Sequence, residues 1–129
     1  MIVVDASAIL ELLLNTQQAT RVAERLFADG ETLHAPHLLD LEVAQVLRRY
    51  AIAGALTEQR GARALEDLGD LPLERYPHHL FVPRIWELRH NLTAYDAAYV
   101  ALAEALASPL VTRDSALAKA RHRARVEVL

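Results

Sequence analysis

The stretch Ile2-Val3-Val4-Asp5 decides the fold, because three apolar residues with β-branched side chains are followed at once by an acid. A short apolar run of this kind predicts a buried strand. The residues from Ala6 to Leu14 predict a helix, and Asp5 is placed to cap it. This strand and helix are the first members of a pattern that continues along the chain.

Strands and helices alternate through the rest of the sequence. Further strands are predicted at residues 31–35, 71–76, 110–112 and 126–129. Helices are predicted at residues 18–27, 37–52, 57–68, 77–90, 93–107 and 115–121, with a break or kink at Pro83. Short apolar strands separated by helices are typical of a parallel sheet covered on both faces. We therefore expect one domain over residues 1–129, a three-layer α/β/α sandwich with a central parallel sheet. Its functional cleft should lie beyond the carboxyl ends of the strands, where the strand order reverses.

Composition excludes several classes of protein. The chain of 129 residues is 53% hydrophobic and 24% charged, so it can bury a core and is not a disordered protein. It has no cysteine, which excludes disulfides, zinc ribbons and thiol nucleophiles. No charge-free run reaches the roughly 18 apolar residues of a membrane span, and Asp5 interrupts the N-terminal apolar stretch. We expect a cytoplasmic protein without a membrane partner, and its net charge of −3 argues against indiscriminate coating of nucleic acid.

Four acids are candidates for a functional site, and each has a purely structural alternative. Asp5 and Asp114 follow predicted strands, where capping a helix is the commoner role. Asp96 lies in a helix that is apolar nearly all round and hence buried, where the alternative is a capping box with Thr93. Glu42 lies at the edge of the apolar stripe of its helix and could simply rim the core.

Taken together, the four acids predict a metal site. Two follow strands and two lie in the opening turns of long helices, so all four should converge on one edge of the sheet. Carboxylates that lie close together cannot all stay ionised without a cation. Ligation by oxygen alone suits Mg²⁺ or Mn²⁺ rather than Zn²⁺. A water on such an ion can attack a phosphodiester, and a second ion can hold the leaving oxygen.

At these residues the sequence resembles the PIN-domain family, and within it the VapC ribonuclease toxins of bacterial toxin–antitoxin pairs. The resemblance rests on the segments MIVVDASA (residues 1–8), LEV (41–43), TAYDAAYVALA (93–103) and VTRD (111–114). The resemblance implies a fold with a central parallel sheet between layers of helices. It also implies that the protein is a metal-dependent endoribonuclease. By position, it places the acidic site on Asp5, Glu42, Asp96 and Asp114, with supporting hydroxyls on Ser7 and Thr112. No acid follows Asp114 closely, so a further carboxylate of some members has no counterpart here.

The resemblance also implies partners: a VapB-type antitoxin, an RNA substrate and a second copy of the chain in a homodimer. Cations gather near the end of the sequence, and we predict that Arg113, Lys119 and Arg121 guide an RNA backbone toward the metal. The alternative is a solvated helix and turn. The run from Leu12 to Leu14 indicates either a subunit contact or full burial within one subunit.

Two other functions stay open on the sequence. A phosphatase of the haloacid dehalogenase type also has an Asp after its first strand, but it requires a second Asp where this chain has Ser7. A non-catalytic binding module would keep the fold and the carboxylates without turnover. Metal-dependent cleavage of RNA would separate a nuclease from a binding module. The aromatic residues Phe81 and Trp86, together with Leu88, are expected in the core.

Overall fold

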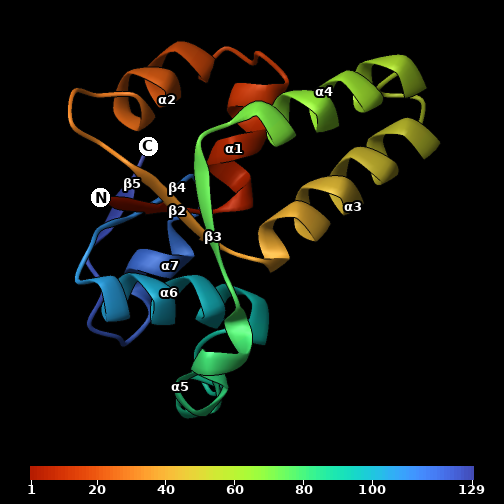
Figure 1. Cartoon of the computed structure of the whole chain (residues 1–129). Helices are drawn as coiled ribbons and strands as arrows, with labels where there is room; N and C mark the ends of the chain where they lie inside the picture. The colour runs from red at the N-terminus through yellow and green to blue at the C-terminus, as the bar shows by residue number, and fades with distance from the viewer.

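A computed structural model of residues 1–129 confirms the α/β/α sandwich, with a central sheet of five parallel strands (Figure 1). The strands are β1 (Ile2–Val4), β2 (Leu33–Pro36), β3 (Leu73–Tyr76), β4 (Leu110–Thr112) and β5 (Val126–Val128). Their order across the sheet is β3-β2-β1-β4-β5. All four pairings between neighbouring strands are parallel, as the alternation of strands and helices predicts.

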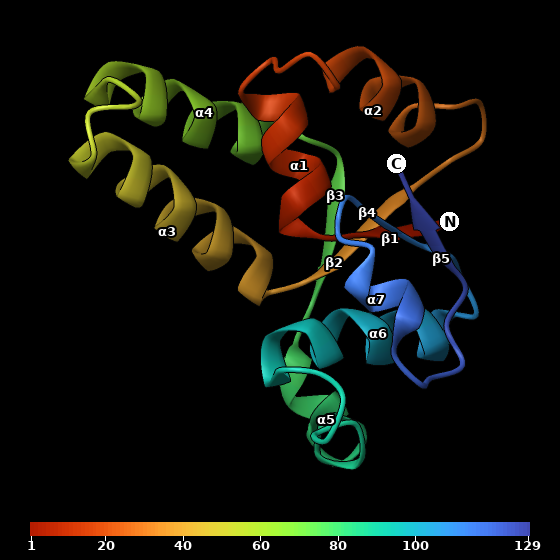
Figure 2. The ribbon, with the colours of Figure 1, turned by 180° about the vertical axis from the view of Figure 1, so that it is seen from behind.

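The helices form the two outer layers. One face of the sheet is covered by α1 (Ala6–Leu13), α2 (Ala19–Leu26), α3 (Leu38–Ile52) and α4 (Glu58–Asp70) (Figures 1 and 2). The other face carries the short 3₁₀ helix η1 (His78–Phe81), α5 (Val82–Glu87), α6 (Ala94–Leu106) and α7 (Ala116–Lys119). In both views α3 and α4 lie side by side. No helix is long and apolar enough to cross a membrane.

The centre of the sheet and the helix α6 form the densest part of the core. The side chains of Ile2, Val3 and Val4 are completely buried, as the apolar run at the start of the sequence predicts. Helix α6 has seven consecutive buried residues, from Ala97 to Ala103. Its many alanines let the helix lie close against β1 and β2, so its few polar side chains are placed by the sheet itself.

The strand order reverses next to β1. The chain passes from β1 to β2 and β3 on one side, then returns to β4 on the other side of β1. The Asp5 amide donates to the Val111 carbonyl, so the end of β1 is bonded to β4. In open α/β sheets this reversal is where a cleft forms beyond the strand ends. Asp5 and Asp114 both lie there.

The segment between β3 and α6 differs from the prediction. The expected helix at residues 77–90 is two short helices, η1 and α5, and Pro83 lies in the first turn of α5. The break predicted near Pro83 is therefore present, because a proline is accommodated in the first turn of a helix, where an amide hydrogen would have no partner within the helix. Leu88 is buried and Phe81 is partly buried, but Trp86 is 67% exposed, so its expected place in the core is wrong. The Arg89 guanidinium lies 4.5 Å from the centre of the Trp86 ring.

The leucine run at the end of α1 is only partly covered within the chain. Leu13 is buried, and Leu12 and Leu14 are partly buried against the same core. The run is therefore not fully buried within one subunit, and a subunit contact through it stays a prediction.

Candidate active site

Asp5 is the most deeply buried of the four candidate acids, at 7% exposure. Asp5 caps α1, because its carboxylate accepts a hydrogen bond from the Ala8 amide at 3.2 Å. The capping role that the sequence suggested for this residue is therefore confirmed. The same carboxylate accepts the Ser7 hydroxyl at 2.7 Å and the Thr112 hydroxyl at 2.5 Å. Burial raises the pKa of Asp5, and these three hydrogen bonds oppose the rise. The Asp5 side chain can therefore cap α1 and belong to the acidic site at the same time.

The predicted hydroxyls join the ends of β1 and β4. The hydroxyl oxygens of Ser7 and Thr112 lie 3.2 Å apart. The Arg113 amide donates to Ser7 Oγ, and the Asp114 amide donates to Thr112 Oγ1, each at 2.9 Å. Asp114 is exposed, and its Oδ1 accepts the Ala116 amide at 2.9 Å just before α7. This network fixes the backbone that carries Asp114 next to Asp5.

Asp96 lies in the first turn of α6, next to the cap residue Thr93. The Asp96 amide donates to Thr93 Oγ1 at 3.1 Å, which is one half of a capping box. The other half, a bond from the Thr93 amide to the Asp96 carboxylate, is absent. Burial raises the pKa of Asp96, the charge of Asp114 raises it further, and the Thr93 side chain opposes the rise. The carboxylate therefore interacts with the acids of the cleft as well as with the cap residue.

Glu42 reaches the site from α3, where it is held by a residue that the sequence analysis did not single out. The buried Tyr99 hydroxyl donates to Glu42 Oε1 at 2.7 Å. Burial strongly raises the pKa of Tyr99, so the phenol stays protonated and remains a donor. Burial also raises the pKa of Glu42, and the charges of Asp96 and Asp5 add to it. A signal for Tyr99 was present, because a phenol in an otherwise apolar helix must find a partner for its hydroxyl.

None of the four acids forms an ion pair with an Arg or Lys side chain; every ion pair of the structure lies elsewhere. Their charges interact with one another, since Asp96 raises the pKa of both Asp5 and Glu42. No three of the side chains meet closely enough to form a ready-made cation site. Even so, carboxylate oxygens without a basic partner are the donors that a hard divalent cation prefers.

The predicted RNA-binding cations differ in their surroundings. The Arg113 side chain contacts the backbone oxygen of Leu129, and its Nε lies 3.6 Å from Glu11 Oε1. Lys119 and Arg121 are exposed and form no ion pair. The contacts of Arg113 within the chain leave its role in RNA binding a prediction, and the same holds for the other two.

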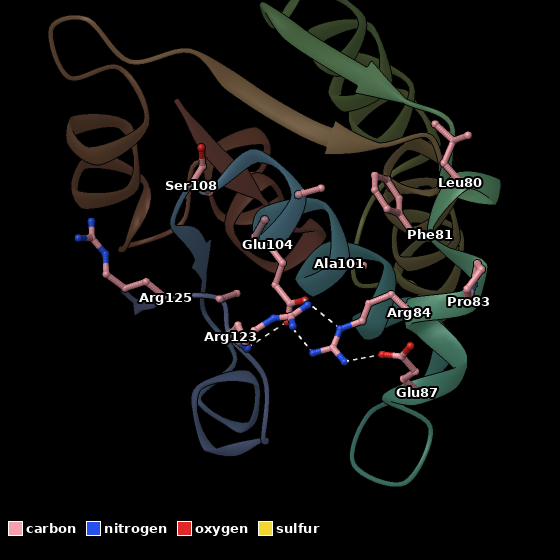
Figure 3. A pocket seen from close by; sticks show the side chains of 14 residues that line it. Leu80, Phe81, Pro83, Arg84, Glu87, Ala101, Glu104, Ser108, Arg123 and Arg125 are labelled. Carbon is pink, nitrogen blue, oxygen red and sulfur yellow. Dashed lines mark hydrogen bonds and ion pairs between the residues drawn. The ribbon is translucent and has the colours of Figure 1, made fainter.

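Two cavities are candidates for the functional site. The larger, of about 800 Å³, is lined by Glu104, Arg84 and Arg123 (Figure 3). Its charges are paired, because Arg84 donates to both carboxylate oxygens of Glu104 at 2.9 and 3.0 Å. The smaller, of about 500 Å³, is lined by Ser7 and Glu42 and adjoins the acids. The smaller cavity is therefore the one that belongs to the candidate site.

Comparison with known proteins agrees with this geometry. The PIN domain profile matches residues 2–123. The chain belongs to the PIN-domain family. Ribonuclease VapC9 of Mycobacterium tuberculosis (H37Rv) is 53% identical over 114 residues, which cover 88% of this PIN domain and 86% of that protein. Ribonuclease VapC12 of the same organism is 41% identical over 130 residues, covering 100% and 99%.

Solved structures share the fold of this PIN domain. The structure of VapBC2 from Rickettsia felis, bound to a DNA fragment from its promoter, has a TM-score of 0.71 at 14% identity and covers 98% of both chains. The structure of PAE2754 from Pyrobaculum aerophilum has a TM-score of 0.68 at 25% identity, covering 97% of this chain and 87% of that chain. Family membership sets aside the phosphatase alternative, which already lacked its second Asp at Ser7.

Proposed function

We propose that this PIN domain is an endoribonuclease toxin of the VapC type, which cleaves RNA phosphodiester bonds with a divalent cation. The observation that carries the proposal is the group of acids at the strand reversal, which has no basic partner although its members raise each other's pKa. The ligands would be Asp5, Glu42, Asp96 and Asp114. Mg²⁺ is the cation that this oxygen donor set suits best, with Mn²⁺ as the other choice. The ribonucleases named above, which cover most of the chain, support the reaction.

The residues of the chain have separate parts in this mechanism. When bound, the cation supplies an activated water and stabilises the charge that develops on the phosphate. Ser7 and Thr112 hold both oxygens of Asp5, and Tyr99 holds one oxygen of Glu42. These hydrogen bonds fix the carboxylates before the cation arrives, which lowers the cost of assembling the site. Lys119 and Arg121 would then draw the RNA backbone toward the acids.

The direct test is cleavage of RNA by metal-stripped protein before and after Mg²⁺ is restored. We expect no cleavage without metal and full cleavage with it. Asp96→Asn should lower the rate at least about 100-fold, because even outer partners of a metal site are worth about 10- to 100-fold. Asp29→Asn is the matched control, since Asp29 is an exposed acid in the loop before β2.

The outcomes separate the alternatives. Cleavage by Asp96→Asn at the wild-type rate would contradict the assignment of the site. Tight RNA binding by wild type without any cleavage would indicate the non-catalytic binding module. Hydrolysis of p-nitrophenyl phosphate in place of RNA would restore the phosphatase.

We also infer a VapB-type antitoxin whose Arg or Lys lies against Glu42, Asp96 and Asp114, because an acidic pocket attracts a planar, bidentate cation. Metal and antitoxin would then compete, and each should weaken the other by the same factor. Antitoxin affinity measured across a Mg²⁺ series at constant ionic strength tests this coupling, since screening alone also weakens charge pairs. Affinity that is indifferent to Mg²⁺, and equal for Asp96→Asn, would show that inhibition does not use the acids.

A homodimer is part of the same proposal. Besides the resemblance to VapC toxins, it is supported by the exposed apolar side chains of Leu80, Val82 and Trp86 on η1 and α5. Sedimentation equilibrium should give twice the chain mass of 14.4 kDa. A monomer at micromolar concentration would contradict it.

A further inference from the structure

The smaller cavity is a groove that begins at the acids and continues beyond them. Ser7 and Glu42 line it on the side of the acids, and the rest of its lining comes from α1, α3 and the first turn of α6. Its volume of about 500 Å³ lies within the range of about 300–1,000 Å³ that is usual for ligand pockets. The groove therefore has room for a group that is bound next to the reacting bond.

One cation lines this groove and has no partner. Arg49 is exposed and forms no ion pair with any acid of the chain. It follows Glu42 by two turns on α3, which places it on the same face about 10 Å further along the helix axis. Arg48 is equally exposed but does not line the groove. An unpaired guanidinium in such a place is suited to a phosphate, which it can bind in bidentate fashion.

The wall of the groove includes an exposed aromatic ring. Tyr95 precedes the predicted ligand Asp96 and is 66% exposed, and Leu41 across the groove is 76% exposed. Large apolar side chains at such exposure are costly to leave in water unless something covers them. An exposed aromatic ring of this kind is a platform on which a nucleic acid base can stack.

We propose that this groove holds one nucleotide of the RNA substrate, adjacent to the bond that is cut, with its base against Tyr95 and its phosphate on Arg49. The inference rests on the proposed ribonuclease function. RNA is the occupant that we assign, because the unpaired Arg49, about 10 Å along α3 from Glu42, complements a phosphate. The groove also opens directly onto Ser7 and Glu42, where a nucleotide next to the cut bond must lie.

The experiment measures binding of a labelled single-stranded RNA by fluorescence anisotropy, in an Asp96→Asn background that does not cleave it. Arg49→Ala should lower the slope of log affinity against log salt by about 0.7, the value expected for one lost phosphate contact on a single strand. Arg48→Ala is the matched control and should leave the slope unchanged. Tyr95→Ala should weaken binding at least about fivefold, whereas Tyr95→Phe, which keeps the ring, should bind as the parent does.

A second readout uses cleavage by proteins that keep Asp96. Arg49→Ala and Tyr95→Ala should raise KM by more than they lower kcat, because both residues act in binding. If wild type cleaves RNA but both variants bind and cleave it like the parent, the inference is overturned. The inference is overturned even if the two variants bind a protein partner more weakly, since the groove would then bind a protein and not RNA. If wild type cleaves no RNA with Mg²⁺, the proposed function fails first and the inference fails with it.

Discussion

The two ends of α6 carry acids with opposite environments. Near its C-terminal end, Glu104 has a side chain that is 7% exposed and is bonded to Arg84 and Arg123 (Figure 3). Burial alone would raise the pKa of Glu104, but the two arginines bring it below its ordinary value. At the other end, burial raises the pKa of Asp96 and no basic side chain opposes it.

This difference separates a structural acid from a functional one. Glu104 fastens α5 and the segment before β5 to α6, since Arg84 and the Arg123 amide both bond to it. The Asp96 carboxylate joins no distant segment to α6 through an ion pair, and its charge is opposed by that of Asp114. A folded protein retains such a destabilising arrangement where another selective demand exists, and binding a cation meets that description.

The largest effect that would sharpen this comparison is on stability. In metal-free protein, Glu104→Gln should lower the free energy of unfolding by about 1–3 kcal/mol, because two arginines lose a charged acceptor. The loss should not be larger, because the Arg123 side chain is 77% exposed and water screens its ion pair with Glu104. Asp96→Asn should leave the free energy unchanged or raise it, because it relieves repulsion. Urea unfolding of both variants measures this, and an equal loss in the two would break the comparison.

The second effect is on the pH dependence of stability in metal-free protein. Asp5, Glu42 and Asp96 have raised pKa values, so the folded protein holds protons that the unfolded chain releases. These three acids therefore make the free energy of unfolding fall as pH rises above about 4, which is the pKa of Asp and Glu in the unfolded chain. Glu104 acts in the opposite direction, because its pKa is lowered: its contribution is present above the unfolded value and disappears as pH falls.

Unfolding in urea from about pH 3 to about pH 8 tests this sign, because the contribution of Glu104 is lost only below about pH 4. Between these limits, Asp96→Asn should lose less stability than wild type as pH rises. The deficit of Glu104→Gln should shrink toward acid pH. If both substitutions change the pH profile in the same direction, the two acids do not differ as described.

The smallest effect is expected at Tyr99. Tyr99→Phe removes only the hydroxyl that donates to Glu42, so the free energy of unfolding should fall by about 0.5–1.5 kcal/mol. The increase in melting temperature that Mg²⁺ gives should shrink as well, but by less than in Asp96→Asn. Tyr50→Phe, at an exposed tyrosine of α3, is the control. A Mg²⁺ response identical to that of wild type would show that Tyr99 does not position Glu42.

The fold could be predicted because its signals are local. The burial of Ile2 to Val4 follows from three apolar residues in sequence, and Thr93 marks the start of α6 by its own side chain. The place of Asp5 at the carboxyl edge of the sheet follows from the alternation of strands and helices, whereas the strand order that reverses next to β1 is seen only in the structure. The exposure of Trp86 was missed, because α5 is a short separate helix that begins at Val82, whereas the pattern alone suggested one longer helix.

The partners of the acids could not be predicted, because they come from distant parts of the chain. In the sequence, Asp96 and Glu104 are alike: they are the two acids, and the only charged residues, of one apolar helix. Glu104 is bonded to Arg84, 20 residues away, and Tyr99 to Glu42, 57 residues away. Only the packed structure shows which carboxylate is neutralised and which is not.

Calorimetric titration of metal-free protein with Mg²⁺, and in parallel with Mn²⁺, tests the central claim most directly, because it measures the cation without relying on RNA cleavage. Wild type and Glu104→Gln should bind the ion with the same affinity, and Asp96→Asn should bind it at least about tenfold more weakly. Equal affinity in all three proteins, or no binding to wild type, would contradict the claim that the unpaired acids at the strand reversal form a metal site.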